Sequence, residues 1–151
     1  MEAEELYVEV GEMTKAHSPD SLWTDGLGPC IAVAVYDPVT KSGYLMHALP
    51  HTSLEPKIEE MSKDYGDLSR LRVFVTGNSM SFYNGIRQDK FDLSERSYVE
   101  GIMTKYFNKR RTTIQWLPDN HCGELHLDTS TGKFKAGSET MDELLYDECE
   151  P

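Results

Sequence analysis

The fold is decided by the stretch Cys30-Ile-Ala-Val-Ala-Val-Tyr36, an apolar run without a charged residue. A continuous apolar run with β-branched residues is typical of a strand buried on both faces of its sheet, so we expect a central strand here. Pro38 and Gly43 stand at turn positions just after it, and a second apolar stretch occupies residues 44–49. Two such runs around a turn predict a β-hairpin.

Further strand and helix patterns flank this hairpin on both sides. The expected strands cover residues 6–10, 71–76, 112–117, 124–128 and 133–136, and the expected helices cover residues 56–65 and 92–107. Residues 26–29, which contain two glycines and a proline, are expected to form a tight loop. Hairpins together with helices predict an α+β fold, a layered α/β sandwich with mixed, hairpin-rich sheets and two main helices.

The length of 151 residues fits one domain. We expect this domain to cover residues 1–136 and to be followed by an acidic, flexible C-terminal tail over residues 137–151. The last thirteen residues hold six acidic side chains and no Lys or Arg, which is typical of a solvated end. The alternative is a docking helix, since Met141, Leu144 and Leu145 stand at helical spacing.

Charge and composition exclude several classes of protein. The chain carries 15 basic and 26 acidic residues, a net charge of −11, whereas a protein that binds nucleic-acid phosphates has the opposite sign. No apolar stretch approaches the roughly 20 residues that span a bilayer, and the acidic N-terminus lacks the pattern of a signal peptide. Three cysteines, an odd number, fit a reducing compartment. We therefore expect a cytoplasmic protein that binds no nucleic acid and does not insert into membranes.

Cys30 and His47 are the residues best suited to chemistry. Cys30 follows a loop with Gly26 and Gly28, where a sulfur can face a partly open cleft and backbone N–H groups can point at a developing oxyanion. His47 lies on the second strand of the expected hairpin, and residues opposed on neighbouring strands have Cβ atoms about 5 Å apart. A thiol beside an imidazole is the arrangement of a cysteine hydrolase.

The same residues have plainer explanations, which remain open at this point. A cysteine at the start of a buried strand is more often a small core residue, and a lone histidine in a strand is more often a partly buried residue with satisfied hydrogen bonds. A metal site is another alternative, because His121, Cys122 and His126 form a loose group. No Cys-x-x-Cys pair supports such a site. We expect no metal and no cofactor.

A longer motif around these residues resembles a known family. The segment Thr24-Asp-Gly-Leu-Gly-Pro-Cys30 is followed by the apolar strand, the turn at Asp37-Pro38, and Met46-His47. This succession resembles the motif of CheD, the family of chemoreceptor glutamine deamidases. Residues 71–80 and 127–135 resemble later segments of the same family. The resemblance therefore covers most of the chain.

The resemblance implies a sandwich fold and the cysteine-dependent conversion of protein glutamine side chains to glutamate. By motif position Cys30 is then the nucleophile, His47 is the general base and later the acid, and Thr24 orients the imidazole. Gly26 and Gly28 belong to the loop that holds the substrate and the oxyanion. The site is similar to that of the cytotoxic necrotising factor deamidases. The implied partners are a protein substrate with an exposed glutamine, such as a chemoreceptor, and a CheC-like phosphatase.

The chain departs from the family pattern around the expected cleft. Pro29 stands where the family has Ser, and a proline has no N–H to donate. Asn78-Ser79 replaces a Gly-Ala pair, and a segment with His121 and Cys122 replaces a Gly-rich segment with an Arg. These departures leave room for a changed substrate or for a chain that only binds. Two alternatives to the deamidase of chemoreceptors therefore stay open. One is a catalytically degenerate scaffold of the same fold that binds a signalling partner, and the other is a toxin-like effector deamidase.

Overall fold

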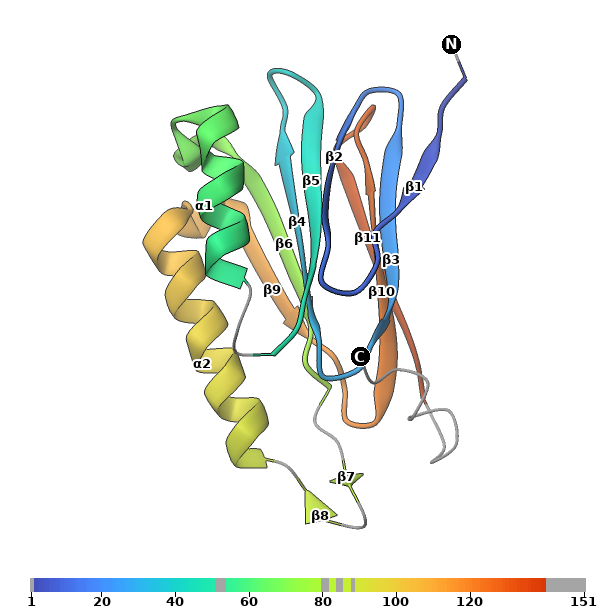
Figure 1. Ribbon diagram of the computed structural model, residues 1–151, viewed down its shortest axis with the longest axis vertical. Coiled ribbons are helices and arrows are strands. Elements are labelled where there is room, and N and C mark those ends of the chain that lie inside the picture. The colour runs from blue at the N-terminus through green and yellow to red at the C-terminus, as the bar shows by residue number, and fades with distance from the viewer. Residues whose placement is uncertain (1, 51–53, 80–81, 84–85, 88, 141–151) are drawn as a thin grey trace.

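The computed structural model describes residues 2–50, 54–79, 82–83, 86–87 and 89–140. Two β-sheets pack face to face, and two helices cover the outer face of one of them (Figure 1). This arrangement is the α+β sandwich with two main helices that the sequence predicts. Both sheets mix parallel and antiparallel pairs, as expected.

The sheet beneath the helices contains the predicted hairpin at its centre. Its strands lie in the order β2 (Met13–His17), β5 (Ser42–Ala48), β4 (Ile31–Asp37), β6 (Arg72–Gly77) and β9 (Thr112–Trp116). β4 pairs antiparallel with both β5 and β6, and every residue of β4 is buried. Alternate side chains of β4 face the helices or the second sheet, which explains why the run is apolar throughout.

The second sheet has the strand order β1 (Glu5–Tyr7), β3 (Ser21–Leu27), β10 (His121–Asp128) and β11 (Lys133–Thr140). β1 runs parallel to β3, and the other pairs are antiparallel. The inner faces of the two sheets share a core to which β4 contributes the small residues Ala32 and Ala34, and β10 the larger Leu125 and Leu127. Small residues opposite large ones let the sheets interdigitate closely.

The helices form a second core with the outer face of the central sheet. α1 (Leu54–Tyr65) buries four side chains at spacings of three and four residues, which is the apolar stripe of an amphipathic helix: Leu54, Ile58, Met61 and Tyr65. α2 (Asp89–Tyr106) contributes Val99, Ile102 and Met103 to the same core. The short elements are η1 (Leu68–Arg70), η2 (Lys109–Arg111), β7 (Phe82–Tyr83) and β8 (Ile86–Arg87).

The structure differs from the sequence-based expectation at several strands, of which β2, β3 and β11 lie closest to the question of the site and the domain boundary. β2 was not expected, because an edge strand with mixed polar side chains carries no apolar alternation. β3 was not expected either, and it includes Gly26 and Leu27 of the expected tight loop, since Gly26 continues the strand with φ +67°. β11 continues to Thr140, four residues past the strand expected over residues 133–136. Residues 141–151, the rest of the expected tail and the site of the alternative docking helix, lie outside the described residues.

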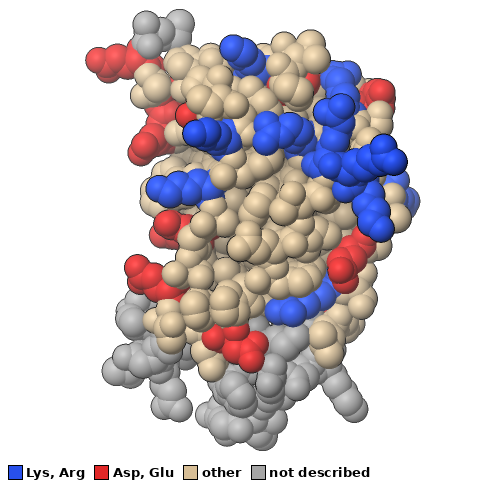
Figure 2. All heavy atoms as spheres, turned by 180° about the vertical axis from the view of Figure 1, so that it is seen from behind, with Lys and Arg blue, Asp and Glu red and all other residues tan. Residues whose placement is uncertain are grey.

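The charge is unevenly distributed over the surface. Lys and Arg side chains gather on the upper part of the face shown in Figure 2, with acidic side chains along one side of that face. The consecutive basic residues of η2 are all exposed. Among the helices of the described chain, none combines the length and the apolar character needed to cross a membrane.

Gly77 is required where β6 ends, and its replacement is expected to destabilise the protein. Its φ is +120°, and a Cβ built there lies 2.2 Å from the backbone oxygen of Cys30. Gly77→Ala is therefore expected to lower the free energy of unfolding by about 2 kcal/mol, measured by urea denaturation. Gly101→Ala in α2 is the matched control, because a Cβ there meets nothing within 4 Å. The control is expected to raise stability by about 0.5–1 kcal/mol, and equal values for the two variants would contradict the prediction.

Candidate active site

Thr24 links the two sheets through its hydroxyl group. The side chain is fully buried on β3, and its Oγ1 donates a hydrogen bond to the backbone oxygen of Val8 at 2.7 Å. The same Oγ1 lies 2.7 Å from Nδ1 of His47 on β5. Because the single hydroxyl proton is given to Val8, Oγ1 accepts a hydrogen bond from His47, whose Nδ1 therefore carries a proton. In the neutral imidazole this leaves Nε2 unprotonated, with its lone pair available.

His47 is held firmly in the central sheet. Its backbone N–H donates to the carbonyl of Glu12, and its carbonyl accepts from the N–H of Gly11. Its ring is fully buried, and within the described part of the chain Nε2 has no hydrogen-bond partner. Burial lowers the pKa of His47 from 6.5 to about 4, and the nearby charge of Asp25 opposes this only in part. The ring is thus neutral at physiological pH, with one nitrogen unused.

Cys30 lies immediately before β4, on the face of the sheet that also carries His47. The register pairs Ala32 with His47, so Cys30, two residues earlier, is a diagonal neighbour of His47 and does not stand directly opposite it. Diagonal neighbours are about 7–8 Å apart at Cα, farther than the direct opposition expected from the sequence. The thiol is free and has no exposed surface. The expected opening of the sulfur onto a cleft is therefore not observed.

The environment of Cys30 favours the neutral thiol. Burial, followed by the negative charge of Glu95, raises the pKa of Cys30 to about 12. Glu95 is itself buried on α2. A preformed thiolate is consequently disfavoured, in contrast to the activated cysteines that lie beside a cationic group. In the described structure a neutral thiol and a neutral imidazole therefore lie on the same face of the central sheet.

The loop before Cys30 is fixed by backbone hydrogen bonds. The N–H of Gly28 donates to the carbonyl of Gly26 at 3.1 Å, and the carbonyl of Gly28 accepts from Ser79 at 2.8 Å. Pro29 supplies no N–H between them. The two glycines that the sequence singled out thus shape the turn that delivers Cys30, and Gly26 does so with a positive φ.

A second group of residues around Cys30 was not expected from the sequence. The N–H of Asn78 donates to the carbonyl of Cys30 at 3.0 Å. Arg96 of α2 donates to the side-chain oxygen of Asn78 at 2.8 Å and to its carbonyl at 2.9 Å. The only sequence signal was the departure at Asn78-Ser79, and nothing in the pattern connected it with a helix residue 18 positions later.

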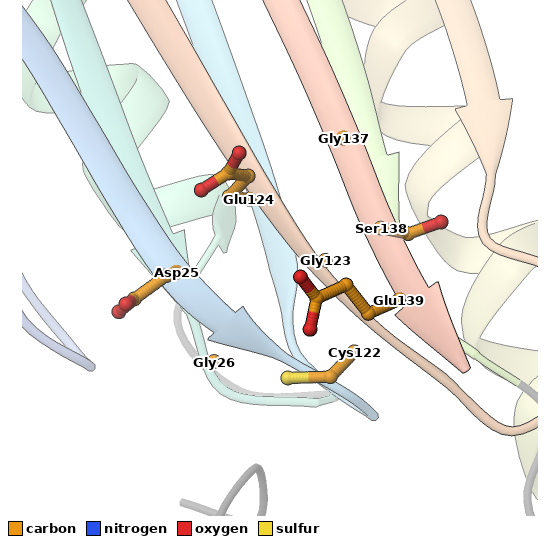
Figure 3. Close-up of a pocket in the computed structure, with 8 residues that line it drawn as sticks. All are labelled: Asp25, Gly26, Cys122, Gly123, Glu124, Gly137, Ser138 and Glu139. Carbon is orange, nitrogen blue, oxygen red and sulfur yellow. The ribbon is translucent and has the colours of Figure 1, made fainter. Parts of the chain in front are cut away.

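A pocket lies beside the loop but does not include the three expected catalytic residues. It has a volume of about 390 Å³ and is formed by the ends of β3, β10 and β11 (Figure 3). Its lining residues are Asp25, Gly26, Cys122, Gly123, Glu124, Gly137, Ser138 and Glu139. His121, which the sequence analysis singled out with Cys122, accepts or donates hydrogen bonds with Ser138 and Thr140. The described residues contain no group of three or more His, Cys, Asp or Glu side chains arranged for a metal ion.

These features define a class of protein: an α+β sandwich in which a threonine and a histidine from different sheets are hydrogen-bonded near a buried cysteine. No protein-family model matches the chain. Curated proteins from several organisms do match it. Each is named "Probable chemoreceptor glutamine deamidase CheD".

The protein from Clostridium tetani is 41% identical to this chain over 149 residues, which cover 87% of this chain and 90% of that protein. The protein from Caldanaerobacter subterraneus subsp. tengcongensis is 30% identical over 115 residues, 66% of this chain and 71% of that protein. The protein from Pyrococcus abyssi is 26% identical over 151 residues, 87% of this chain and 90% of that protein. The chain belongs to the CheD family of chemoreceptor glutamine deamidases.

Proposed function

We propose that this chain is a cysteine-dependent protein-glutamine deamidase that acts on chemoreceptors. The observation that carries the proposal is the hydrogen bond from His47 Nδ1 to Thr24, which leaves Nε2 with a free lone pair on the face that carries Cys30. This buried Nε2 has no hydrogen-bond partner among the described residues. A buried polar nitrogen without a hydrogen bond is costly, and such groups are found where chemistry uses them. The names of the relatives supply the substrate class.

The first half of the proposed reaction forms a thioester. Sγ of Cys30 attacks the carbonyl carbon of the glutamine side chain while its proton passes to Nε2 of His47. Backbone N–H groups of the loop that ends at Cys30 stabilise the negative charge that develops on the oxygen. His47 then returns the proton to the leaving nitrogen, and the C–N bond breaks to release ammonia.

The second half restores the enzyme. Nε2 of His47 takes a proton from a water molecule as the water oxygen attacks the thioester carbon. The C–S bond then breaks, the thiolate recovers a proton from the imidazolium, and glutamate is released. The sum is glutamine plus water giving glutamate plus ammonia. In both halves the Thr24 oxygen accepts the Nδ1–H bond, which keeps the base in the required tautomer.

The protonation states point to a proton transfer that accompanies attack. The pKa of Cys30 is raised to about 12 and that of His47 is lowered to about 4, so the ion pair is not the resting state. Since Cys30 has no exposed surface, the substrate reaches it only after a local opening that brings Sγ to the glutamine carbon. A substrate carbonyl that enters this dry site is then polarised strongly by the backbone donors.

A binding role without catalysis is the second candidate. The burial of Cys30 and the raised pKa of its thiol favour this alternative, in which the chain binds a signalling partner on the same fold. A CheC-like phosphatase as partner remains a prediction from the resemblance. The two candidates are separated by whether the chain changes its partner covalently.

The test is a deamidation assay with a chemoreceptor cytoplasmic fragment. The fragment is incubated with the purified chain, released ammonia is measured with a coupled enzyme, and the converted glutamine is located by peptide mass spectrometry. We expect one ammonia for each glutamine converted to glutamate. Binding of the fragment without release of ammonia would replace the deamidase proposal with the scaffold.

Loss of the Thr24 hydroxyl is expected to reduce the rate without abolishing it. Thr24→Val keeps the shape but removes the acceptor for His47 Nδ1–H, so the imidazole loses its fixed tautomer. We expect kcat to fall by about 10- to 100-fold, measured by ammonia release. Thr24→Ser retains the hydroxyl and is expected to recover most of the rate. Equal rates for the Val and Ser variants would show that the hydrogen bond does not serve catalysis.

A further inference from the structure

Asn78 and Ser79, which directly follow β6, hold the backbone of Cys30 and of the loop before it. Asn78 is buried and adopts φ +50° directly after β6. Its N–H donates to the carbonyl of Cys30, and the next N–H, that of Ser79, donates to the carbonyl of Gly28. Two consecutive amides thus hold two carbonyls of the segment that presents the thiol. The absence of a Cβ at Gly77 allows this close approach of the two backbones.

Arg96 holds Asn78 in turn. Its Nε and Nη2 donate to the side-chain oxygen and to the carbonyl of Asn78, so one guanidinium fixes both the side chain and the peptide group. The guanidinium also lies over the ring of Trp116 in β9, with its carbon 5.4 Å from the ring centroid. A planar fork of donors with this geometry is available to Arg but not to Lys.

We propose that Arg96 and Asn78 are positioning residues that set the place of Cys30 relative to His47. This inference rests on the proposed deamidase function. Neither side chain acts on the substrate in this account. Arg96 fixes Asn78, and Asn78 fixes the carbonyl of Cys30. The sulfur is thereby kept on the face of the sheet that carries His47. A displacement of about 1 Å at a reacting group can lower the rate about 100-fold. Residues that fix the backbone of Cys30 are therefore expected to have a large effect on kcat.

The chain offers a matched control at the other end of the same strand. Arg70 donates from Nε and Nη2 to the two carboxylate oxygens of Asp37, the last residue of β4. Arg70→Lys therefore removes the same kind of two-donor contact as Arg96→Lys, but at the end of β4 that lies far from Cys30. Arg96→Lys and Arg70→Lys are both expected to lower the melting temperature by a few degrees.

The deciding readout is the split between kcat and KM in the ammonia assay. Arg96→Lys is expected to lower kcat about tenfold with KM within about twofold, while Arg70→Lys leaves kcat within about twofold. Asn78→Gly tolerates the positive φ and keeps the N–H, but it loses the side-chain oxygen. Its kcat is expected to lie between the kcat of Arg96→Lys and that of Arg70→Lys. Wild-type kcat in Arg96→Lys, or equal losses in both Lys variants, would overturn the positioning role.

Amide hydrogen exchange makes the test independent of activity. The N–H of Asn78 is expected to exchange at least about tenfold faster in Arg96→Lys than in the wild type, because its bond to Cys30 opens more often. Arg70→Lys is expected to leave this exchange rate unchanged. If the wild type releases no ammonia, the proposed function fails while this comparison still decides whether Arg96 positions Cys30. Equal exchange rates of the Asn78 amide in all three proteins would refute the positioning role of Arg96.

Discussion

Cys30→Ala is expected to abolish ammonia release while leaving the fold intact. The proposed reaction passes through a thioester at Sγ, so a variant without the sulfur lacks the nucleophile of the first step. Removal of a catalytic nucleophile costs many orders of magnitude in rate, so we expect a fall of at least about 1,000-fold, to the limit of the assay. The measurement is the single-turnover and steady-state release of ammonia from the receptor fragment.

The stability of this variant provides its control. Cys30 is a small buried residue in the core between the sheets, and Ala fits the same space. We expect the free energy of unfolding to fall by only about 1 kcal/mol, so lost activity in a folded variant is attributable to the sulfur. Full activity in Cys30→Ala would remove Cys30 from the mechanism, and retained binding of the receptor fragment would show that recognition does not need the thiol.

The fold was predictable where burial leaves a pattern in the sequence. β4 is buried on both faces, so its apolar run indicated a central strand, and Pro38 lies in the turn between β4 and β5 as expected. Gly43, which was also expected in that turn, lies in β5 and pairs with Tyr36 of β4. The sequence pattern did not predict strands at the edge of a sheet or strands with an irregular backbone. β2 pairs with one neighbour only and carries polar side chains, and Gly26 continues β3 with a positive φ that sequence rules assign to turns.

The contact between Thr24 and His47 was predictable from the motif, whereas the surroundings of Cys30 were predictable only in part. Motif positions pointed to Thr24 and His47, and the structure brings their side chains within 2.7 Å of each other from different sheets. Burial of Cys30 was one of the two alternatives that the sequence left open. The raised pKa of its thiol was not predictable, because it also depends on the charge of Glu95 in α2, far away in the sequence. The hydrogen bonds from Arg96 to Asn78 also join residues that are far apart in the sequence, and local sequence patterns cannot indicate them.

The stability of the protein is expected to depend on pH through His47. Its pKa is about 4 in the folded protein and 6.5 when unperturbed, because the buried ring resists protonation. Between these values the unfolded chain binds more protons at this residue, so the free energy of unfolding rises with pH across this interval. Above 6.5 the full stability is present, and as the pH falls toward 4 roughly 3 kcal/mol of it is lost.

The experiment compares urea unfolding of the wild type and of His47→Gln at several pH values from 4 to 7. The variant lacks the buried imidazole, so we expect its stability to change less over this range, with the difference between the two proteins growing toward pH 7. His17→Gln, at an exposed position on β2, is the matched control and is expected to keep the wild-type pH dependence. Parallel curves for wild type and His47→Gln would mean that His47 charges as easily in the folded protein as in the unfolded chain. An imidazole that charges so easily cannot be the dry, neutral base that the proposed proton transfer requires.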